Sequence, residues 1–342
     1  MTKSSRNEVL DAVRGIAIIL VMVGHVSDVN VTHFFDSTIA NVIWSLQIPL
    51  FMLISGYVTK YSQPIDDNKS YFQYLIKRTT AYLLPWVIWT IFVKGILLGT
   101  TDLISYIKYI VFTMDAGYWF LFSLWTICLV FGTSTLIATK MSEKKLFRIV
   151  ITVLTSIILA AFLLIVGIKV GISFLGIKLT LYYLPFFYLG YLFVNIEKEY
   201  TGRKWFEITK KAVVLPSIII YSLIILNFNL YYADDAFNII LRFVASVLGC
   251  MIVFYAMANI AANISTKVKR LLMFSGQWSL ELYVVHALLI SIIDVVPKPE
   301  FLSVNGFILC LINFALMLLF SIIIISVISS NKWSRYYVFG KK

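Results

Sequence analysis

Apolar segments about twenty residues long recur from one end of this chain to the other. A helix needs roughly 20 mainly apolar residues to cross the hydrocarbon core of a bilayer. The sequence predicts such segments at residues 9–29, 38–58, 80–98, 118–138, 146–166, 177–195, 212–232, 237–262, 278–296 and 306–330. The 342 residues are 60% hydrophobic and 13% charged, which is more apolar surface than a soluble domain can bury. We therefore expect an all-α integral membrane protein, a bundle of about ten transmembrane helices that forms a single domain over residues 1–342.

The basic residues predict the orientation of these helices. If the N-terminus is cytoplasmic, most of the 29 lysines and arginines fall in the connections that strict alternation places on the cytoplasmic side. Short cytoplasmic loops of membrane proteins carry such an excess of positive charge. The bias predicts an N-in, C-in arrangement. It also explains the net charge of +12, so we expect no nucleic-acid partner.

The first predicted helix contains RGIAIILVMVGH, residues 14–25, with an ionisable residue at each end. Eleven helical steps separate Arg14 from His25, which is three turns plus about 20°, so Asp11, Arg14 and His25 share one stripe. The rise between Arg14 and His25 is roughly 16 Å. In one interpretation the stripe faces a cavity, with a cation at cytosolic depth and a titratable base near the outer face. In the other, Arg14 is a snorkelling anchor and His25 an interfacial polar residue, and spacing alone does not choose between them.

The ninth predicted helix favours the first interpretation. Its sequence SLELYVVH, residues 279–286, places Glu281 at about the depth of Arg14 if it starts on the cytosolic side. Buried charges in a membrane usually pair, so we expect an Arg14–Glu281 contact, with or without Asp11. His286 lies nearer the middle of the membrane. A neutral imidazole bonded to a neighbouring helix is its simpler alternative.

Two further features are less informative. Residues 100–117 carry apolar side chains at helical intervals, which predicts a short helix on the outer face, either a cover for a cavity or a simple interfacial connector. The three cysteines all fall inside predicted helices without paired spacing. We therefore expect neither a disulfide nor a metal site.

Taken together, these residues resemble the membrane acyltransferase-3 family. Arg14 and His25 resemble its Arg/Lys-x10-His signature in the first helix. Four other segments resemble family patterns in order and place: LQIPLFMLISGYV at 46–58, YFQYLIKRTTAYLLPW at 71–86, GYWFLFSLW at 117–125 and SLELYVVH at 279–286. The resemblance covers essentially the whole chain, and its specificity lies in the combination of motifs.

The resemblance implies a function and its reactants. Members of the family use acyl-CoA to acylate sugars and glycans at the bacterial surface. It therefore implies a multi-pass enzyme of the bacterial cytoplasmic membrane that moves an acyl group, first of all acetyl from acetyl-CoA, to a hydroxyl of a glycan or a lipid-linked saccharide. Membrane lipid is the surrounding partner, and a homo-oligomer is an open alternative to a monomer.

The resemblance also implies roles for individual residues. His25 would be the catalytic histidine, as a general base or as a nucleophile, with Arg14 and Asp11 on the same catalytic stripe. Arg14, Lys77 and Arg78 would supply cations for the CoA phosphates. The expected tunnel and substrate residues are Tyr57, Trp119, Glu281, Tyr283 and His286.

Three other functions remain as alternatives. A secondary transporter would use the same ionisable groups as a proton or substrate path, but it predicts paired broken helices in corresponding halves of the chain. A polysaccharide export or assembly protein is the second alternative. The third is a non-catalytic membrane subunit, which would need no aligned Arg14–His25 stripe.

Overall fold

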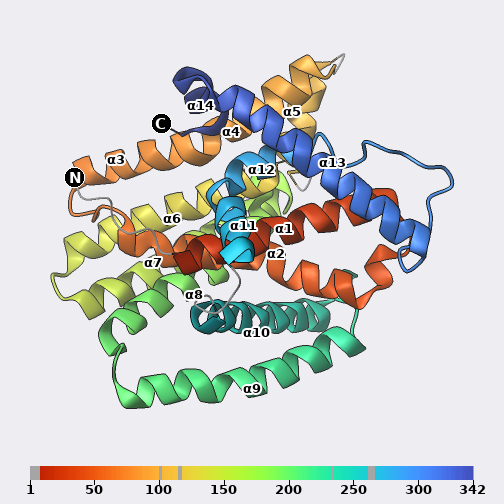
Figure 1. Ribbon diagram of the computed structural model, residues 1–342. Coiled ribbons are helices and arrows are strands. Elements are labelled where there is room, and N and C mark those ends of the chain that lie inside the picture. The colour runs from red at the N-terminus through yellow and green to blue at the C-terminus, as the bar shows by residue number, and fades with distance from the viewer. Residues whose placement is uncertain (1–7, 100–101, 115–117, 233–234, 261–265, 342) are drawn as a thin grey trace. The chain divides into compact units, whose positions relative to one another are not determined.

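The computed structural model describes residues 8–99, 102–114, 118–232, 235–260 and 266–341, and these residues are almost entirely helical (Figure 1). Across the described residues there is no strand beyond a single isolated bridge between Thr32 and Glu300. The prediction of an all-α bundle is confirmed.

Nine helices within the described ranges are long and apolar enough to cross a membrane. They are α1 (Glu8–Asn30), α2 with its final turn (Thr38–Tyr61), the composite helix Asn68–Leu97, α6 (Trp119–Met141), α7 (Lys145–Val170), α8 with its preceding turn (Phe174–Tyr200), α9 (Lys204–Asn227), α10 (Ala236–Ile260) and α13 (Val304–Ser329). Each corresponds to one of the predicted segments. The composite helix and α9 begin earlier than predicted, at Asn68 and Lys204. Their first turns are polar, so a search for apolar segments does not include them.

The predicted helix at 278–296 is wrong over most of its length. Its place is taken by α11 (Thr266–Gln277) and α12 (Ser279–His286), and residues 287–303 are not helical. The backbone of Trp278 still bonds to Phe274 at 3.1 Å and to Leu282 at 2.8 Å, so the helical ladder continues across the junction. The helix cannot extend to residue 296 because Pro297 and Pro299 follow and because other groups bond the backbone after Ile290.

The composite helix Asn68–Leu97 is irregular. It consists of α3 (Asn68–Arg78), the π-helical turn Thr79–Leu83, α4 (Leu84–Val87) and a second π-helical stretch, Ile88–Leu97. Pro85 has no N–H to donate, so a regular α-helical ladder cannot pass through it. Asp67 and Ser70 form a capping box that fixes the start of α3.

A short helix, α5 (Leu103–Phe112), lies within the predicted segment 100–117. Asp102 caps it by accepting hydrogen bonds from the backbone N–H groups of Ile104 and Ser105. The ends of the segment, 100–101 and 115–117, lie outside the described residues, as does the first residue of the GYWFLFSLW motif. The short helix is confirmed, and its place on the outer face stays a prediction.

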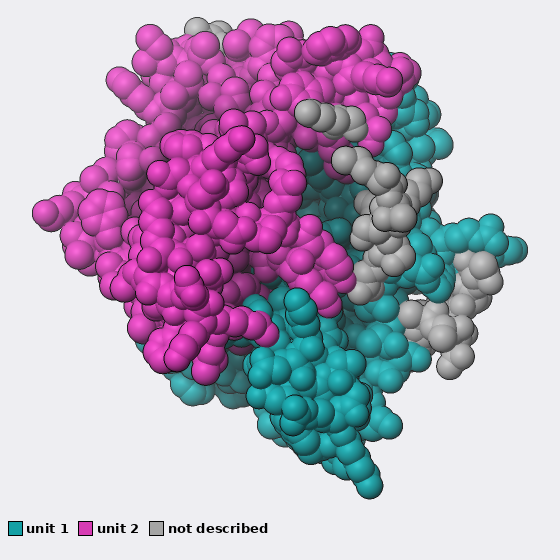
Figure 2. Space-filling view, turned by 90° about the vertical axis from the view of Figure 1, so that its left-hand side faces the viewer, with its two compact units in different colours: residues 1–57, 192–327 teal, residues 58–191, 328–342 magenta. Residues whose placement is uncertain are grey.

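The chain divides into two compact units, coloured separately in Figure 2. Unit 1 comprises Met1–Tyr57 and Leu192–Val327, and unit 2 comprises Val58–Tyr191 and Ile328–Lys342. In unit 1, α1 and α2 are mostly buried, whereas most residues of α9 and α10 are exposed or only partly buried. That exposure is the surface expected of helices that face lipid. The prediction of one functional domain over 1–342 is not tested by this division and stays a prediction.

In unit 1, α1 packs directly against α11 through two glycines. A Cβ atom added to Gly15 would lie 2.0 Å from the carbonyl oxygen of Leu272. One added to Gly276 would lie 1.8 Å from the carbonyl oxygen of Asp11. The two backbones therefore touch, as small residues permit in membrane helices. No other amino acid fits at either position without separating the helices.

Candidate active site

The most informative contact of unit 1 joins two histidines. Nδ1 of His25, in α1, lies 3.2 Å from Nε2 of His286, the last residue of α12. The ring centroids are 5.2 Å apart. His286 is fully buried and His25 is partly exposed. Sequence analysis expected both residues near the reaction, but only the structure shows that they form a pair.

The hydrogen bonds of His286 determine which nitrogen of His25 is basic. Nδ1 of His286 lies 2.8 Å from the carbonyl oxygen of Leu282, and a carbonyl only accepts, so this nitrogen carries a hydrogen. In the neutral ring, Nε2 of His286 then has a lone pair and accepts from Nδ1–H of His25. The lone pair of His25 is consequently on Nε2.

The glycine contact of α1 and α11 explains why the two histidines meet. Gly15 precedes His25 by ten residues, and Gly276 precedes His286 by the same number. The helices touch at the glycines and again at the histidines, so the chain runs in the same direction in both segments. Because each histidine follows its glycine by the same number of helical residues, the two imidazoles lie at the same distance along the helices from the glycine contact.

On the far side of the histidines, two buried asparagines hold the chain after α12. Asn30, in the last turn of α1, donates to the carbonyl oxygens of Val26 and Ile290, each at 2.9 Å. Its Oδ1 accepts from Ser291 at 2.8 Å and from Asn313 at 2.9 Å. The amide of Asn30 is therefore fully used, and it ties α1 to the segment that follows His286.

Asn313, in α13, completes this asparagine clamp. Its Oδ1 accepts from the backbone N–H groups of Ile292 at 3.1 Å and Ile293 at 2.8 Å. Its Nδ2 donates to the carbonyl oxygen of Ile293 at 2.9 Å as well as to Asn30. These bonds satisfy backbone groups that a broken helix would otherwise leave unpaired in an apolar environment. The sequence alone does not single out either asparagine.

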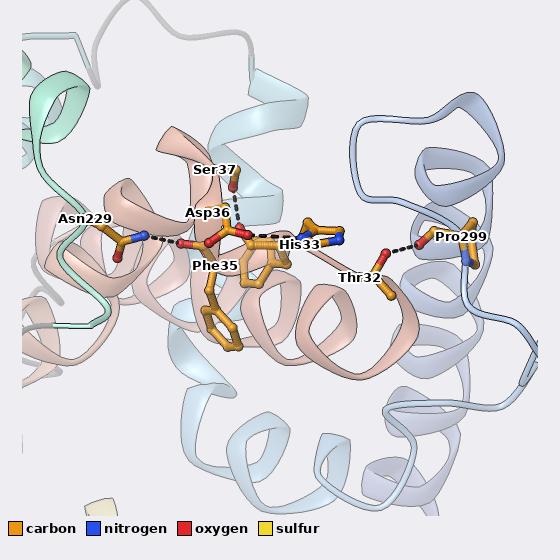
Figure 3. A network of polar contacts seen from close by, with 8 residues as sticks. Thr32, His33, Phe35, Asp36, Ser37, Asn229 and Pro299 are labelled. Atoms are coloured by element: carbon orange, nitrogen blue, oxygen red, sulfur yellow. Dashed lines mark hydrogen bonds and ion pairs between the residues drawn. The ribbon is translucent and has the colours of Figure 1, made fainter.

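The third histidine of the chain belongs to a separate network. His33 and Asp36 form an exposed contact at 3.2 Å in the turn between α1 and α2 (Figure 3). Asn229 donates to the carbonyl oxygen of Phe35 at 2.8 Å, and Thr32 donates to that of Pro299 at 3.4 Å. These bonds anchor the turn after α1 to the two neighbouring connections.

The predicted charged residues of α1 lie nearer its N-terminal end. Arg14 forms an ion pair with Asp11, with Nη1 3.5 Å from Oδ1. Gln277 also donates to Oδ2 of Asp11, at 3.2 Å. Asp11 and Glu281 are buried, and Arg14 is partly exposed. The predicted contact between Arg14 and Glu281 stays a prediction.

Two predicted tunnel residues of unit 1 have different surroundings. Tyr283 is buried, and its ring centroid lies 6.0 Å from that of His286. Tyr57 donates its hydroxyl to the carboxylate of Glu197 and packs against Phe193 and Phe254. Tyr283 thus belongs to the surroundings of the histidine pair, whereas Tyr57 is held by a carboxylate on α8 (Ile177–Tyr200).

Two of the three predicted phosphate-binding residues, Lys77 and Arg78, lie in unit 2, at the end of α3. Arg78 donates from Nη2 to the hydroxyl of Ser62 at 2.8 Å, and its guanidinium lies 5.1 Å from the ring centroid of Tyr74. Among the described residues Arg78 has no carboxylate partner, and its enclosed Nε–H has no acceptor. Lys77 is exposed and donates to Gln63 at 3.2 Å. A guanidinium in this state is suited to an anion from outside the chain.

Trp119, at the start of α6 in unit 2, stacks on Tyr183, with centroids 5.6 Å apart and an interplanar angle of 18°. Within the described ranges, no group of three or more histidine, cysteine, aspartate or glutamate side chains could hold a metal ion.

The sequence of this chain matches the model of a known protein family. The model of the acyltransferase-3 family, described as an acyltransferase domain, matches residues 7–329. The chain belongs to the acyltransferase-3 family. The match includes both histidines of the pair, the asparagine clamp and Arg78.

One curated relative of this family member is the nodulation protein NolL of Sinorhizobium fredii (strain NBRC 101917 / NGR234). The two sequences are 26% identical over 215 residues, which is 57% of this chain and 51% of NolL. The chain thus aligns with about half the length of that relative. No solved structure matches the chain.

Proposed function

We propose that this protein is an integral membrane O-acyltransferase that moves an acetyl group from acetyl-CoA to a hydroxyl of a glycan or lipid-linked saccharide. The observation that carries the proposal is the His25–His286 pair, in which a buried histidine presents Nε2 of a partly exposed one as a base. The family supports the reaction type, since its domain is that of an acyltransferase. The bacterial cytoplasmic membrane is the proposed location.

His25 has the central role in the proposed reaction. Nε2 of His25 takes the proton of the acceptor hydroxyl while the hydroxyl oxygen attacks the thioester carbonyl carbon. The C–O bond forms, the C–S bond breaks, and the proton passes from His25 to the departing thiolate of CoA. His286 accepts a hydrogen bond from Nδ1–H of His25, which orients the ring and stabilises the imidazolium during the transfer.

A covalent route uses the same nitrogen. Nε2 of His25 would attack the thioester carbon, release CoA thiol and carry the acetyl group as an acyl-imidazole, which the acceptor hydroxyl would then attack. We favour direct transfer because it needs one step in place of two. Both routes require the lone pair on Nε2 that His286 imposes.

The donor would be held by cations. Arg78 supports this role through its unused N–H and the lack of a carboxylate partner among the described residues, and Lys77 is exposed beside it. Guanidinium groups bind phosphate oxygens in a bidentate manner. Arg14, balanced by Asp11, would add a weaker contribution, with Glu281 as a further counter-charge.

The remaining predicted residues would surround the reactants. We propose that Tyr283 lines the acyl path beside the histidine pair and that Tyr57 and Trp119 line it elsewhere or hold the acceptor. Each is aromatic, which suits a narrow pantetheine arm or a saccharide face.

The test is acetyl transfer in native membrane vesicles. Acetyl-CoA labelled in the acetyl group and the polysaccharide fraction of the host envelope serve as reactants, and label in the polysaccharide is measured. We expect transfer by the wild type and none above background by His25→Ala present at equal amounts in the membrane. Wild-type transfer by His25→Ala overturns the role of His25. Transport of a solute without any acyl transfer would favour the transporter alternative.

A further inference from the structure

One buried amide oxygen of unit 1 has no hydrogen-bond donor among the residues that the structure describes. Gln47 lies in the middle of α2 (Thr38–Tyr57) and is 6% exposed. Its Oε1 is completely enclosed, and no donor among the described residues reaches it. An enclosed carbonyl oxygen without a donor destabilises the folded state, since it has lost its bonds to water. A buried polar group without a partner in a native protein needs an explanation, such as a catalytic role or a bound water, ion or ligand.

The other buried amides of unit 1 show that this fold can satisfy such groups. Asn41 occupies the same helix, and it donates to the carbonyl oxygens of Ile225 at 3.0 Å and Phe228 at 2.8 Å. Its Oδ1 accepts from the backbone N–H of Leu230 at 2.9 Å. Asn30 and Asn313 are fully bonded as well. Among the described buried amides of unit 1, Gln47 is therefore the exception.

The position of Gln47 connects this exception with His25. A Cβ atom added to Gly24 would lie 3.4 Å from Oε1 of Gln47 and 3.0 Å from Cγ2 of Ile43. The backbone neighbour of the unbonded oxygen is thus the residue directly before His25. A molecule whose hydroxyl reaches the imidazole of His25 can bring a second donor to Oε1 of Gln47 once the side chains that enclose this oxygen move aside.

We propose that Gln47 is a binding residue for the acyl acceptor, accepting a hydrogen bond from a hydroxyl next to the one that is acylated. The proposal rests on the proposed function. A carbonyl oxygen requires a donor, and neither the acetyl group nor the thioester has one. A saccharide carries hydroxyls on neighbouring carbons, so one can meet His25 while the next meets Gln47. The amide N–H groups and the hydroxyl of pantetheine are the other available donors, and the experiment separates donor from acceptor.

The experiment compares Gln47→Met with the wild type in the vesicle assay. Methionine keeps the length of the side chain and removes the acceptor oxygen. We expect the apparent KM for the envelope polysaccharide to rise about tenfold, the size of one lost hydrogen bond, and the KM for acetyl-CoA to change less than twofold. The thermal midpoint should be equal or higher, because an enclosed unbonded oxygen has been removed. Leu50→Met, a buried change in the same helix, is the matched control and should alter neither KM.

A second variant keeps the proposal testable if Gln47→Met does not reach the membrane. Gly24→Ala places a methyl group 3.4 Å from Oε1, and the methyl also lies 3.0 Å from Cγ2 of Ile43, so the Ile43 side chain has to shift by a few tenths of an ångström. We expect it to raise the polysaccharide KM and leave that for acetyl-CoA unchanged.

Three results would overturn the proposal, and they differ from each other. A raised KM for acetyl-CoA alone assigns Oε1 of Gln47 to a donor group of pantetheine. Unchanged KM values with a lower thermal midpoint assign Gln47 to the structure alone. If the wild type transfers no acetyl group, the proposed function itself fails, and the assignment of Gln47 fails with it.

Discussion

The surroundings of His25 and those of Arg78 are built in opposite ways. In unit 1, His286 and the asparagine clamp have their hydrogen bonds supplied by the chain itself. In unit 2, Arg78 is left with an enclosed Nε–H that has no acceptor and with no carboxylate partner among the described residues. The first arrangement fixes one geometry before any ligand arrives. The second leaves positive charge available, so the two regions are suited to chemistry and to binding respectively.

The largest expected effect comes from the replacement of His286. His286→Leu leaves Nδ1–H of His25 without its acceptor, so His25 loses both its fixed tautomer and the group that stabilises its imidazolium. We expect kcat to fall about 10²–10⁴-fold, the range of general acid–base catalysis, with the KM for acetyl-CoA little changed. Initial rates of acetyl transfer measure both constants. His33→Leu, which changes an exposed histidine, is the control, and an equal loss in both variants would contradict the proposed pair.

The matching test in unit 2 is Arg78→Gln. If Arg78 binds the donor phosphates, the KM for acetyl-CoA should rise about 10–100-fold, the value of a charged hydrogen bond, while kcat stays within a few-fold of the wild type. Titration of acetyl-CoA at fixed polysaccharide measures this change. Lys140→Gln removes a cation from the same unit and should have no such effect. A fall in kcat without a change in KM would mean that unit 2 does not hold the donor.

Removal of Asn313 from the asparagine clamp should have an effect of intermediate size, on both the stability of the protein and the rate of transfer. Asn313→Leu leaves the N–H groups of Ile292 and Ile293 and the Oδ1 of Asn30 each short of a bond. Each unpaired buried group costs about 1–3 kcal/mol, so we expect a clear drop in the thermal midpoint in detergent. Because the segment after His286 is loosened, kcat should fall more than either KM changes. Leu309→Met, also buried in α13, is the control, and a rate loss of equal size there would show that the clamp has no special role.

The smallest expected effect concerns the start of α3, which ends at Arg78. Hydrogen bonds from the backbone and side chain of Ser70 lower the pKa of the Asp67 carboxyl below its usual value. A lowered pKa means that the cap stabilises the fold above the unfolded pKa, about 3.9, and that this stabilisation is lost as pH falls through the lowered pKa.

Asp67→Ala should therefore lower the thermal midpoint slightly at pH 7 and make no difference well below pH ~3.9. Midpoints measured at several pH values test this. Asp66→Ala changes a neighbouring carboxylate that does not cap the helix and should have no effect at any pH. A difference between Asp67→Ala and the wild type that grows as the pH falls would contradict the assigned cap.

The sequence predicts the helices of this protein well because lipid-facing helices are long and apolar. The segment 278–296 is the exception, since its hydropathy resembles that of a crossing helix although the helix ends at His286 and the asparagine clamp binds the backbone at residues 290–293. The sequence also identifies His25 as a candidate site residue, because its spacing from Arg14 is a local property of one helix.

Contacts between helices could not be predicted in the same way. An asparagine in an apolar helix, such as Asn30 or Asn313, does not reveal which backbone group it bonds. Nor does the sequence state whether the amide of Gln47 is bonded or left without a donor. The pairing of His25 with His286 depends on the contact of Gly15 with Gly276, two residues far apart in the chain.

That glycine contact makes the lengths of two distant segments interdependent. Deleting one residue between Gly276 and His286 would turn His286 by about 100° and draw it back about 1.5 Å, away from His25. A matching deletion between Gly15 and His25 would rotate and shift the other imidazole by the same amounts. Either deletion alone should separate the two rings, and the double deletion should restore part of their alignment. The separation of His25 from Gly15 must therefore equal the separation of His286 from Gly276, and both are ten residues.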